Sequence, residues 1–443
     1  MVAAAGPVAP VPAHETLVFL LQVGLLLSTA FLLGRLSIRL GMPAIVGELC
    51  AGVLLGPGVL AHVLPRLSGW LFPHNVGQAH MLDAVGQVGV LLLVGITGAQ
   101  MDLGLVRRRG ATAVRVSIAG LVVPLGLGVG AGLLLPRSLV PPTAQRGTFA
   151  LFLGVAMGLS AIPVIAKTMM DMRLLHRNVG QLTLCAGMVD DIIGWLLLSI
   201  VSVMATSALR AGDVGISLGY LGIVIAVAVL ARPLVRIGLR TVGRSKDSVP
   251  TVAFVTCLVL LGAAATQALK LEGVFGAFVV GILISSSKAV DAERLAPLRV
   301  VILSVLAPLF FATAGLRMDL TALAKPTVLL TGLGVLLLAI TGKFVGGYTG
   351  ARLSRIGHWE ALALGAGINA RGVIEVIVAL VGLRLGVLSV EMYTIIVLVA
   401  IVTSLMAPPV LRFAMARVEQ TEEERLREAA IGIDQASPHR TIA

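Results

Sequence analysis

The feature that most constrains the fold is a long series of apolar segments, each able to cross a lipid bilayer. A spanning helix needs roughly 17 to 25 mostly apolar residues, and about thirteen segments of this sequence meet that criterion. Their approximate ranges are 16–34, 43–60, 82–100, 112–135, 148–168, 179–206, 214–236, 250–268, 271–287, 297–316, 326–351, 359–383 and 392–416. We number these expected helices 1 to 13. The pattern predicts an all-α polytopic membrane protein.

Composition supports this class and excludes others. Hydrophobic residues make up 57% of the 443-residue chain and charged residues only 13%, a balance that soluble domains do not have. The net charge of +12 would suggest a nucleic-acid partner in a soluble protein. Here Lys and Arg lie in short loops, so they indicate topology instead, and we expect no nucleic-acid partner.

Cysteine and histidine spacing gives no sign of a resident metal or other cofactor. Cys50, Cys185 and Cys257 lie in apolar segments without CxxC spacing and are expected to pack as small side chains. None of the seven histidines forms an HExxH-like pair, so no structural metal is expected.

The distribution of positive charge orients the helices. With the N-terminus outside, the inner loops and tail hold roughly 22 Lys and Arg and the outer loops roughly 8, which favours N-out and C-in. The densest inner clusters are Arg107–Arg109 and the run from Arg232 to Lys246. No Lys or Arg precedes helix 1, whereas a signal peptide has a basic start, so we expect helix 1 to be retained. The tail at 417–443 is polar, and about 26 residues are too few for a nucleotide-binding domain.

Two internal matches predict an inverted repeat. Gly47–Leu55 in helix 2 (GELCAGVLL) matches Gly276–Ile284 in helix 9 (GAFVVGILI), and Gly98–Leu103 (GAQMDL) after helix 3 matches Gly315–Leu320 (GLRMDL) after helix 10. Each matched pair lies seven helices apart, and because seven is odd, equivalent helices cross the membrane in opposite directions. Chance similarity between glycine-rich helices is the alternative. Agreement in both order and offset favours two six-helix repeats joined by helix 7, an arrangement typical of transporters.

Under this pairing helix 5 corresponds to helix 12, and both contain residues that interrupt a helix. Helix 5 contains GLSAIP, in which Pro163 removes a backbone donor and disfavours helix before it, near Ser160. Helix 12 contains GAGINARG, with Asn369 and Arg371 among glycines. An ordinary kink would explain either helix alone, but the matched pair predicts two broken helices that cross.

Ionisable residues inside the expected helices point to function. Asp190 lies about eleven residues, or about 17 Å, into helix 6, close to mid-membrane. Each buried aspartate costs about 2.5 to 3.5 kcal/mol on insertion scales, so the Asp190–Asp191 pair predicts a functional site. Lys343 in helix 11 is the natural counter-charge for one of them. Arg371 and Glu375, four residues apart in helix 12, can pair on one helical face.

These groups suit competition between a proton and a cation. Hard monovalent cations prefer oxygen ligands, which carboxylates, hydroxyls and freed backbone carbonyls supply. Neighbouring buried carboxylates also bind protons in a coupled way. If only the loaded forms reorient across the membrane, this competition becomes obligatory exchange.

Four runs of the sequence together resemble the monovalent cation:proton antiporter superfamily, in its bacterial sodium/proton and potassium-efflux branch. They are GELCAGVLLGP, the stretch from Ser160 to Trp195, GKFVGG and GINARGVIE, and the similarity runs from about helix 2 to helix 13. It implies a transport core of helices 4–6 and 11–13 and a dimerisation body of helices 1–3 and 8–10, with helix 7 as linker. It also implies a homodimer in a bacterial plasma membrane whose core moves like an elevator.

The resemblance also implies roles for individual residues. Asp191 would be the principal cation and proton ligand, Asp190 would pair with Lys343, and Ser160 would lie at the crossover. The paired acidic motif resembles electrogenic members of the superfamily. Potassium-efflux relatives often carry Gln before the Asp, together with a large cytosolic nucleotide-binding domain. This sequence has neither feature, which favours Na⁺ over K⁺; K⁺ and Li⁺ remain the alternative cations.

Three other functions remain as alternatives to an antiporter. A potassium-efflux channel on the same scaffold would need no proton-competing carboxylates, and an organic-anion transporter would need fewer acids at the crossing. An intramembrane aspartyl protease also uses two aspartates, but its dyad brings carboxyls together from separate helices to share a proton. Neighbouring residues on one helix point about 100° apart, so we do not expect an enzyme.

Overall fold

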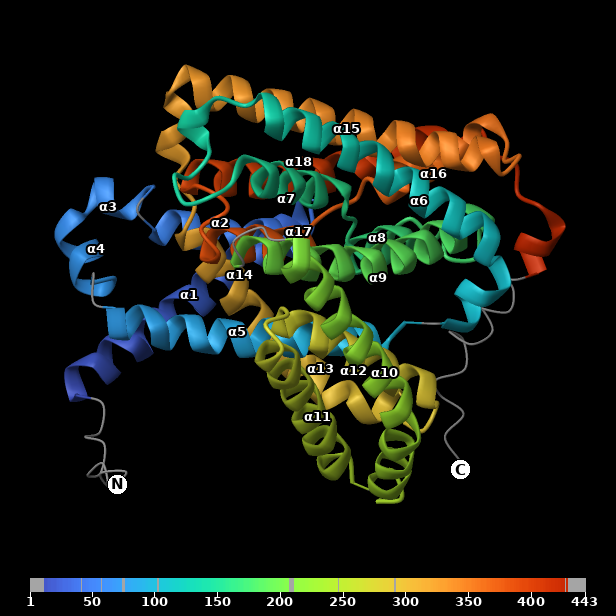
Figure 1. Cartoon of the computed structure of the whole chain (residues 1–443), viewed down its shortest axis with the longest axis horizontal. Coiled ribbons are helices and arrows are strands. Elements are labelled where there is room, and N and C mark those ends of the chain that lie inside the picture. Colours follow the sequence, from blue (N-terminus) through green and yellow to red (C-terminus); the bar gives the residue numbers. More distant parts are fainter. Residues whose placement is uncertain are drawn as a thin grey trace. The chain divides into compact units, whose positions relative to one another are not determined.

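A computed structural model describes residues 12–40, 42–56, 58–73, 76–101, 103–206, 211–245, 247–290, 292–426 and 428. These residues form helices joined by turns, with no strand among them (Figure 1). Several features named above lie partly outside the described set. They are the side chains of Arg107–Arg109 and Pro163, residue Lys246, and the last part of the 417–443 tail.

The expected segments are all helical. Ten described helices are long and apolar enough to cross a membrane, and a pair bent by 44° makes an eleventh span. Two shorter apolar helices, α7 (Arg146–Gly158) and α12 (Gly273–Ser287), correspond to the first part of expected helix 5 and to most of expected helix 9. The prediction of an all-α polytopic membrane fold is confirmed.

Some boundaries differ from the prediction for identifiable reasons. Expected helix 2 ends early, since α2 covers Ala44–Leu55 and the backbone turns extended at Gly56. Expected helix 10 is not regular, because a π-helical stretch at Ile302–Leu306 precedes α14 (Ala307–Leu316). Other helices begin or end beyond their apolar runs, as α6 does at Leu103, where polar residues continue the helix.

The chain forms two compact units. Unit 1 comprises 1–90 and 300–320, and unit 2 comprises 91–299 and 321–443. Unit 1 contains α1 (Ala13–Arg39), α2, α3 (Leu60–Val63), α4 (Pro65–Leu71), the first part of α5 (Val76–Ala99) and α14. Its core brings Leu26 and Ala30 of α1 together with Ala51 of α2 and Leu309 and Ala312 of α14.

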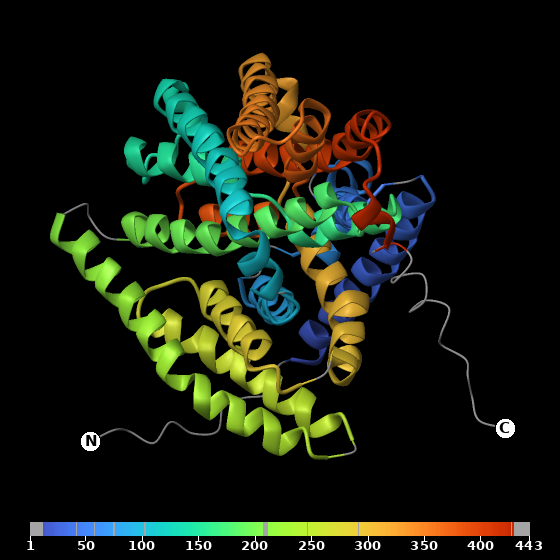
Figure 2. The same cartoon turned by 90° about the vertical axis from the view of Figure 1, so that its right-hand side faces the viewer.

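Unit 2 contains the remaining long helices. They are α6 (Leu103–Leu134), α7, α8 (Ile162–Asp171), α9 (Asn178–Thr206), α10 (Ala211–Val242), α11 (Val249–Ala268), α12, α15 (Pro326–Leu353), α16 (His358–Ile368), α17 (Val373–Arg384) and α18 (Val390–Met415). Within unit 2, α6, α15, α16 and α18 pack side by side (Figures 1 and 2). The predicted division into a transport core and a dimerisation body stays a prediction.

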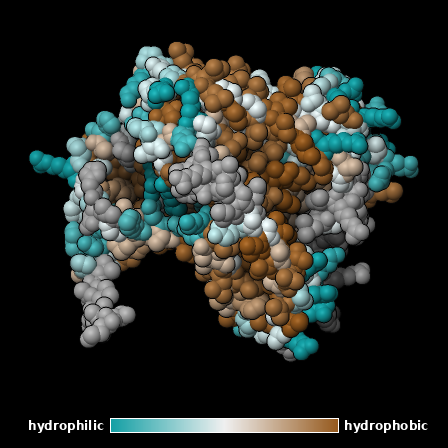
Figure 3. All heavy atoms as spheres, in the orientation of Figure 1, coloured by the Kyte–Doolittle hydropathy of each residue, from teal (hydrophilic) through white to brown (hydrophobic). Residues whose placement is uncertain are grey.

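The surface is as apolar as a lipid-facing protein requires. The most apolar window of α10 has no buried residue, and Leu230 and Leu234 on it are 74% and 71% exposed. Figure 3 shows hydrophobic side chains spread over much of the face that it presents. Water would make this exposure costly, whereas lipid makes it favourable.

The glycines of the two sequence matches make equivalent contacts. In unit 1, Gly52 of α2 packs against Gly315 and the Ala312 carbonyl of α14. In unit 2, Gly281 of α12 packs against Gly98 at the end of α5. The repeat pairs Gly52 with Gly281 and Gly315 with Gly98, so one contact is the repeat image of the other. A Cβ at any of these four glycines would overlap the opposite backbone.

Candidate functional site

Two helices of unit 2 are broken, and the breaks cross. Helix α7 ends at Gly158 and α8 begins at Ile162, while α16 ends at Ile368 and α17 begins at Val373. The Ser160 hydroxyl donates to the Ile368 carbonyl at 2.8 Å, and the Ala161 N–H donates to the Ala370 carbonyl at 3.2 Å. The predicted breaks near Ser160 and Asn369 are therefore confirmed, and hydrogen bonds join the two interrupted backbones.

Residue chemistry explains the first break. Pro163 occupies the first turn of α8, where a missing N–H costs nothing and the fixed φ suits a helix start. Leu159 and Ala161, which flank Ser160, are extended, so the chain leaves the helical ladder immediately before α8 begins. In the second break four residues, Asn369 to Gly372, leave the helical ladder.

Asp190 lies beside this crossing with every oxygen hydrogen-bonded. Its Oδ2 lies 2.7 Å from Ser160 Oγ, whose one proton is shared between this carboxylate and the Ile368 carbonyl, and it forms an ion pair with Lys343 Nζ at 2.7 Å. Its Oδ1 accepts from the hydroxyl of Ser117 on α6. Both charged side chains are 0% exposed. Four elements therefore meet at one carboxylate: α6, the α7–α8 break, α9 and α15.

Asp191 is the opposite case. Its side chain is 1% exposed, and neither carboxylate oxygen has a hydrogen-bond partner among the described residues. Asn369, at 0% exposure, likewise has no partner for either side-chain polar atom within that set. Buried polar atoms normally have partners because an unsatisfied group costs free energy. Such orphaned oxygens are what a site for a transported cation or proton would present.

Two cations satisfy the carbonyl end of α7. Lys343 Nζ donates to the Gly158 carbonyl as well as to Asp190, and the Arg371 guanidinium donates to the Met157 carbonyl at 2.6 Å. The last carbonyls of a helix lack partners and carry partial negative charge. The break in helix 5 therefore creates an electronegative end that holds both cations in place.

Arg371 also connects the α16–α17 break to α17 and α15. It forms an ion pair with Glu375 at 3.0 Å and donates to the Ala339 carbonyl of α15 at 3.0 Å. Its own carbonyl accepts from Ser404 of α18. The Arg371 side chain is 0% exposed. This arrangement supports a structural part for the pair at the crossing rather than direct contact with Asp190.

Ser117 is the residue of this site that the sequence did not indicate. It lies in a run of apolar and small residues on α6, and serines are common in membrane helices. The only sequence evidence for a role of Ser117 is its location, because it carries a hydroxyl group in expected helix 4, one of the helices assigned to the transport core. Ser404 of α18, which donates to the Arg371 carbonyl, was missed for the same reason.

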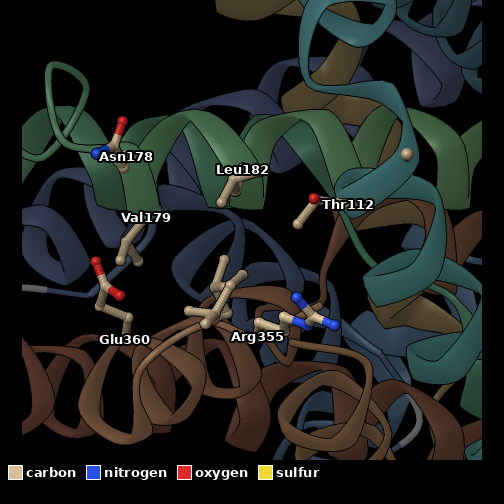
Figure 4. A pocket seen from close by; sticks show the side chains of 9 residues that line it. Thr112, Asn178, Val179, Leu182, Arg355 and Glu360 are labelled. Carbon is tan, nitrogen blue, oxygen red and sulfur yellow. The ribbon is translucent and has the colours of Figure 1, made fainter. Parts of the chain in front are cut away.

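A cavity of about 490 Å³ lies at one end of unit 2, around the start of α9. It is lined by residues from α6, α9, α16 and the turn after α15: Ala111, Thr112, Asn178, Val179, Leu182, Arg355, Ile356, Glu360 and Leu364. Figure 4 shows Glu360, Arg355 and Thr112 around it. Three of its helices continue inward to Ser117, Asp190 and Ile368. The cavity therefore lies at the end of the bundle from which these helices lead to the carboxylates.

Known proteins provide an independent comparison. Residues 26–417 match the family model described as sodium/hydrogen exchanger, transmembrane. The chain is 30% identical over 398 residues to the Na⁺/H⁺ antiporter NhaS4 of Synechocystis sp., covering 89% of this chain and 97% of that protein. It is 26% identical over 406 residues to the Na⁺/H⁺-K⁺ antiporter GerN of Bacillus cereus, covering 89% and 96%.

The fold is similar to a solved antiporter. The structure of the sodium proton antiporter MjNhaP1 from Methanocaldococcus jannaschii aligns with a TM-score of 0.68 at 18% identity, covering 90% of this chain and 99% of that one. The family match, which spans most of the chain, agrees with the broken helices and buried carboxylates described above. The chain belongs to the sodium/hydrogen exchanger family of multi-pass membrane proteins.

Proposed function

We propose that this cation/proton antiporter exchanges Na⁺ for protons, and that Asp191 is the group for which the two compete. The observation that carries the proposal is the contrast between neighbouring carboxylates. Asp190 accepts from Ser117, Ser160 and Lys343, whereas Asp191 is equally buried and has no partner in the described part of the chain. A carboxylate without donors can bind either a proton or a cation, but not both at full strength.

Asp190 and Lys343 have a different part in the proposal. A buried ion pair neutralises two charges that would each be costly alone. When Na⁺ binds at Asp191, its positive charge weakens the attraction between the ammonium and Asp190. Lys343 then releases a proton more readily. Proton release from both Asp191 and Lys343 would make the exchange electrogenic.

The preference for Na⁺ follows from the available ligands. Hard monovalent cations take carboxylate, hydroxyl and carbonyl oxygens, and Asp191 lies next to a crossing where the backbone is interrupted. The named relatives act on Na⁺ or on Na⁺ and K⁺, and K⁺ and Li⁺ are the competing candidates. Ser160, which bonds both Asp190 and Ile368, positions the crossing next to the carboxylates.

Alternating access would use the core as a moving body. We infer that helices 4–6 and 11–13 carry the carboxylates across the membrane past a dimerisation body, in a homodimer with the N-terminus outside. The hydrogen bonds that join α6, α7, α9, α15 and the α16–α17 break around Asp190 and Arg371 support a rigid core. The cavity at the start of α9 would lie on the cytoplasmic side under this orientation.

The experiment is transport in proteoliposomes under an imposed pH gradient. Na⁺, Li⁺, K⁺ and choline are added in turn while pH-sensitive and voltage-sensitive dyes are read together. The proposal predicts proton flux with Na⁺, none with choline, and a change in voltage. A cation current without proton flux would indicate a channel. Absence of any cation-dependent proton flux would contradict the antiporter proposal.

A further inference from the structure

The N-terminus of α9, the helix that carries both aspartates, has a residue that does not stabilise a helix start. Arg177 is the N-cap residue of α9, since its carbonyl accepts the first helical bond, from Gln181 N–H at 3.1 Å. N-cap positions favour Ser, Thr, Asp or Asn, whose side chains accept hydrogen bonds from the exposed N–H groups. The N-terminal end of a helix also carries partial positive charge. An arginine here supplies no acceptor and adds like charge, and Arg173 and His176 precede it.

A carboxylate from the far end of the chain corrects this start. Glu424 Oε1 accepts from the Asn178 N–H at 2.6 Å, and Glu424 Oε2 lies 3.2 Å from Arg177 Nε. The Glu424 side chain is 3% exposed. One carboxylate therefore provides both the missing cap and the missing negative charge, although it is 246 residues away in sequence.

Glu424 is itself held by a local capping box. Its backbone N–H donates to Thr421 Oγ1 at 3.3 Å, and its Oε2 accepts from the Thr421 N–H at 2.9 Å. This reciprocal pair begins the short helical stretch at 422–426. The side chain is thus fixed in direction before it reaches α9.

Further contacts hold the same segment against the loop before α9. Arg177 donates to the carbonyls of Val418 and Glu419 at 3.0 and 3.1 Å. His176 Nε2 lies 3.1 Å from Gln420 Nε2 and 3.6 Å from Glu428 Oε2. We call residues 418–426 together with 428 the tail clamp. An acidic segment thus meets a basic loop.

The contacts of Glu424 and Glu428 favour the charged forms of both carboxylates. Burial alone would raise the pKa of Glu424, but hydrogen bonds from Asn178 and Thr421 and the charge of Arg177 hold this pKa below its usual value. A hydrogen bond from Gln420 and the nearby His176 lower the pKa of Glu428. Both carboxylates therefore stay negatively charged in the clamped state.

We propose that the tail clamp positions α9 for transport, with Glu424 as the positioning residue. The carboxylates at Asp190 and Asp191 lie about 18 Å along the helix from Asn178, on the same rigid rod. The inference rests on the proposed function, since it assigns to the tail a part in holding the ion-binding helix. Release of the tail would loosen the start of α9 and the cavity wall formed by Asn178, Val179 and Leu182.

The test compares Glu424→Ala with Glu422→Ala in the full-length protein. Glu422 lies in the same helical turn and is exposed, so its replacement removes the same atoms and charge without touching α9. Deuterium exchange should become several-fold faster at the first amides of α9 in Glu424→Ala only. The apparent KM for Na⁺ in proteoliposomes should rise about threefold to tenfold, as expected for loss of a helix cap, with the maximal rate changed less than twofold.

Two further variants sharpen the result. Glu424→Gln keeps an acceptor for Asn178 but loses the charge, so its KM should lie between those of wild type and Glu424→Ala. Arg177→Ala combined with Glu424→Ala should raise KM by less than the product of the two single effects, because both variants lose the same Arg177–Glu424 ion pair. Unchanged deuterium exchange in Glu424→Ala would disprove the clamp. Faster deuterium exchange with unchanged KM would leave Glu424 a structural role only and overturn the proposal. Absence of Na⁺-dependent transport by the wild-type protein would instead contradict the proposed function. The deuterium-exchange comparison does not depend on transport, so the two failures can be distinguished.

Discussion

Lys343 and Asp190 form a fully buried ion pair at 2.7 Å, and the same ammonium also donates to the Gly158 carbonyl at the broken end of α7. The Lys343 ammonium thus links α9, which carries Asp190, to the end of α7, where the first broken helix is interrupted. In the mechanism proposed above, Asp191 exchanges a proton for Na⁺, and Na⁺ binding weakens this link so that Lys343 also releases a proton.

The ion pair predicts strongly coupled substitutions. Lys343→Ala leaves Asp190 without its counter-charge, and breaking a buried pair costs about 3 to 5 kcal/mol, so the melting temperature should fall. Asp190→Asn with Lys343→Gln should recover much of that loss while abolishing the voltage signal of transport. The measurement is a double-mutant cycle on thermal stability, with voltage-dye recordings of each variant. Additive losses together with unchanged electrogenicity would contradict the assigned roles.

Ser117 should influence transport more than its small size suggests. Ser117→Ala removes one donor from Asp190, and an unsatisfied buried acceptor costs about 1 to 3 kcal/mol. We expect a shifted pH profile of transport, with partial rescue by Ser117→Thr, which restores a hydroxyl. Ser199→Ala is the matched control, because Ser199 is equally buried and its one hydrogen bond to a described residue is to Trp195 of its own helix. Identical pH profiles for Ser117→Ala and Ser199→Ala would remove Ser117 from the site.

The glycine contacts of the repeat predict selective intolerance to a methyl group. A Cβ at Gly52 would meet the Ala312 carbonyl and lie 2.7 Å from Gly315 Cα. Gly52→Ala should therefore destabilise the protein by about 1 to 3 kcal/mol, the usual cost of overpacking. Gly126→Ala on α6 is the control, since nothing lies within 4 Å of a Cβ there. Equal melting temperatures for the two variants would show that α2 and α14 tolerate separation.

Much of the fold could be predicted because a membrane-spanning helix requires a long apolar run, which is visible in the sequence. The thirteen apolar segments, the breaks around Pro163 and Asn369, and the costly charges at Asp190 and Lys343 are local signals that the bilayer makes strong. The short lengths of α7 and α12 could not be predicted, since an apolar run does not determine where the helical backbone hydrogen bonds end.

Other features depend on contacts between distant parts of the chain. Ser117 is one serine among several in apolar helices, and only its distance to Asp190 distinguishes it. Glu424 is one of three consecutive glutamates in a polar tail, and its partner lies 246 residues earlier. The acidic tail and the basic stretch before α9 are both visible in the sequence, but charge complementarity alone does not select one partner loop among the basic loops of this chain.

The tail clamp should persist across the neutral range of pH. The pKa of Glu424 is lower in the clamped state than the ordinary Glu value of about 4.3. The charge-dependent stabilisation is therefore complete above that ordinary value and is lost as pH falls through the lower one. Deuterium exchange at the start of α9, corrected for the intrinsic rate, should stay constant between about pH 6 and 8. Loss of protection within that interval would mean that another group controls the contact.

The central claim is that a cation and a proton compete at Asp191, and proton release on cation binding tests it most directly. Na⁺ is added to purified protein in weakly buffered solution while a pH-sensitive dye is read, with choline as the ionic-strength control. We predict proton release from wild type and from Asp247→Asn, which changes an exposed aspartate, and none from folded Asp191→Asn. Undiminished Na⁺-induced proton release from Asp191→Asn would contradict the account.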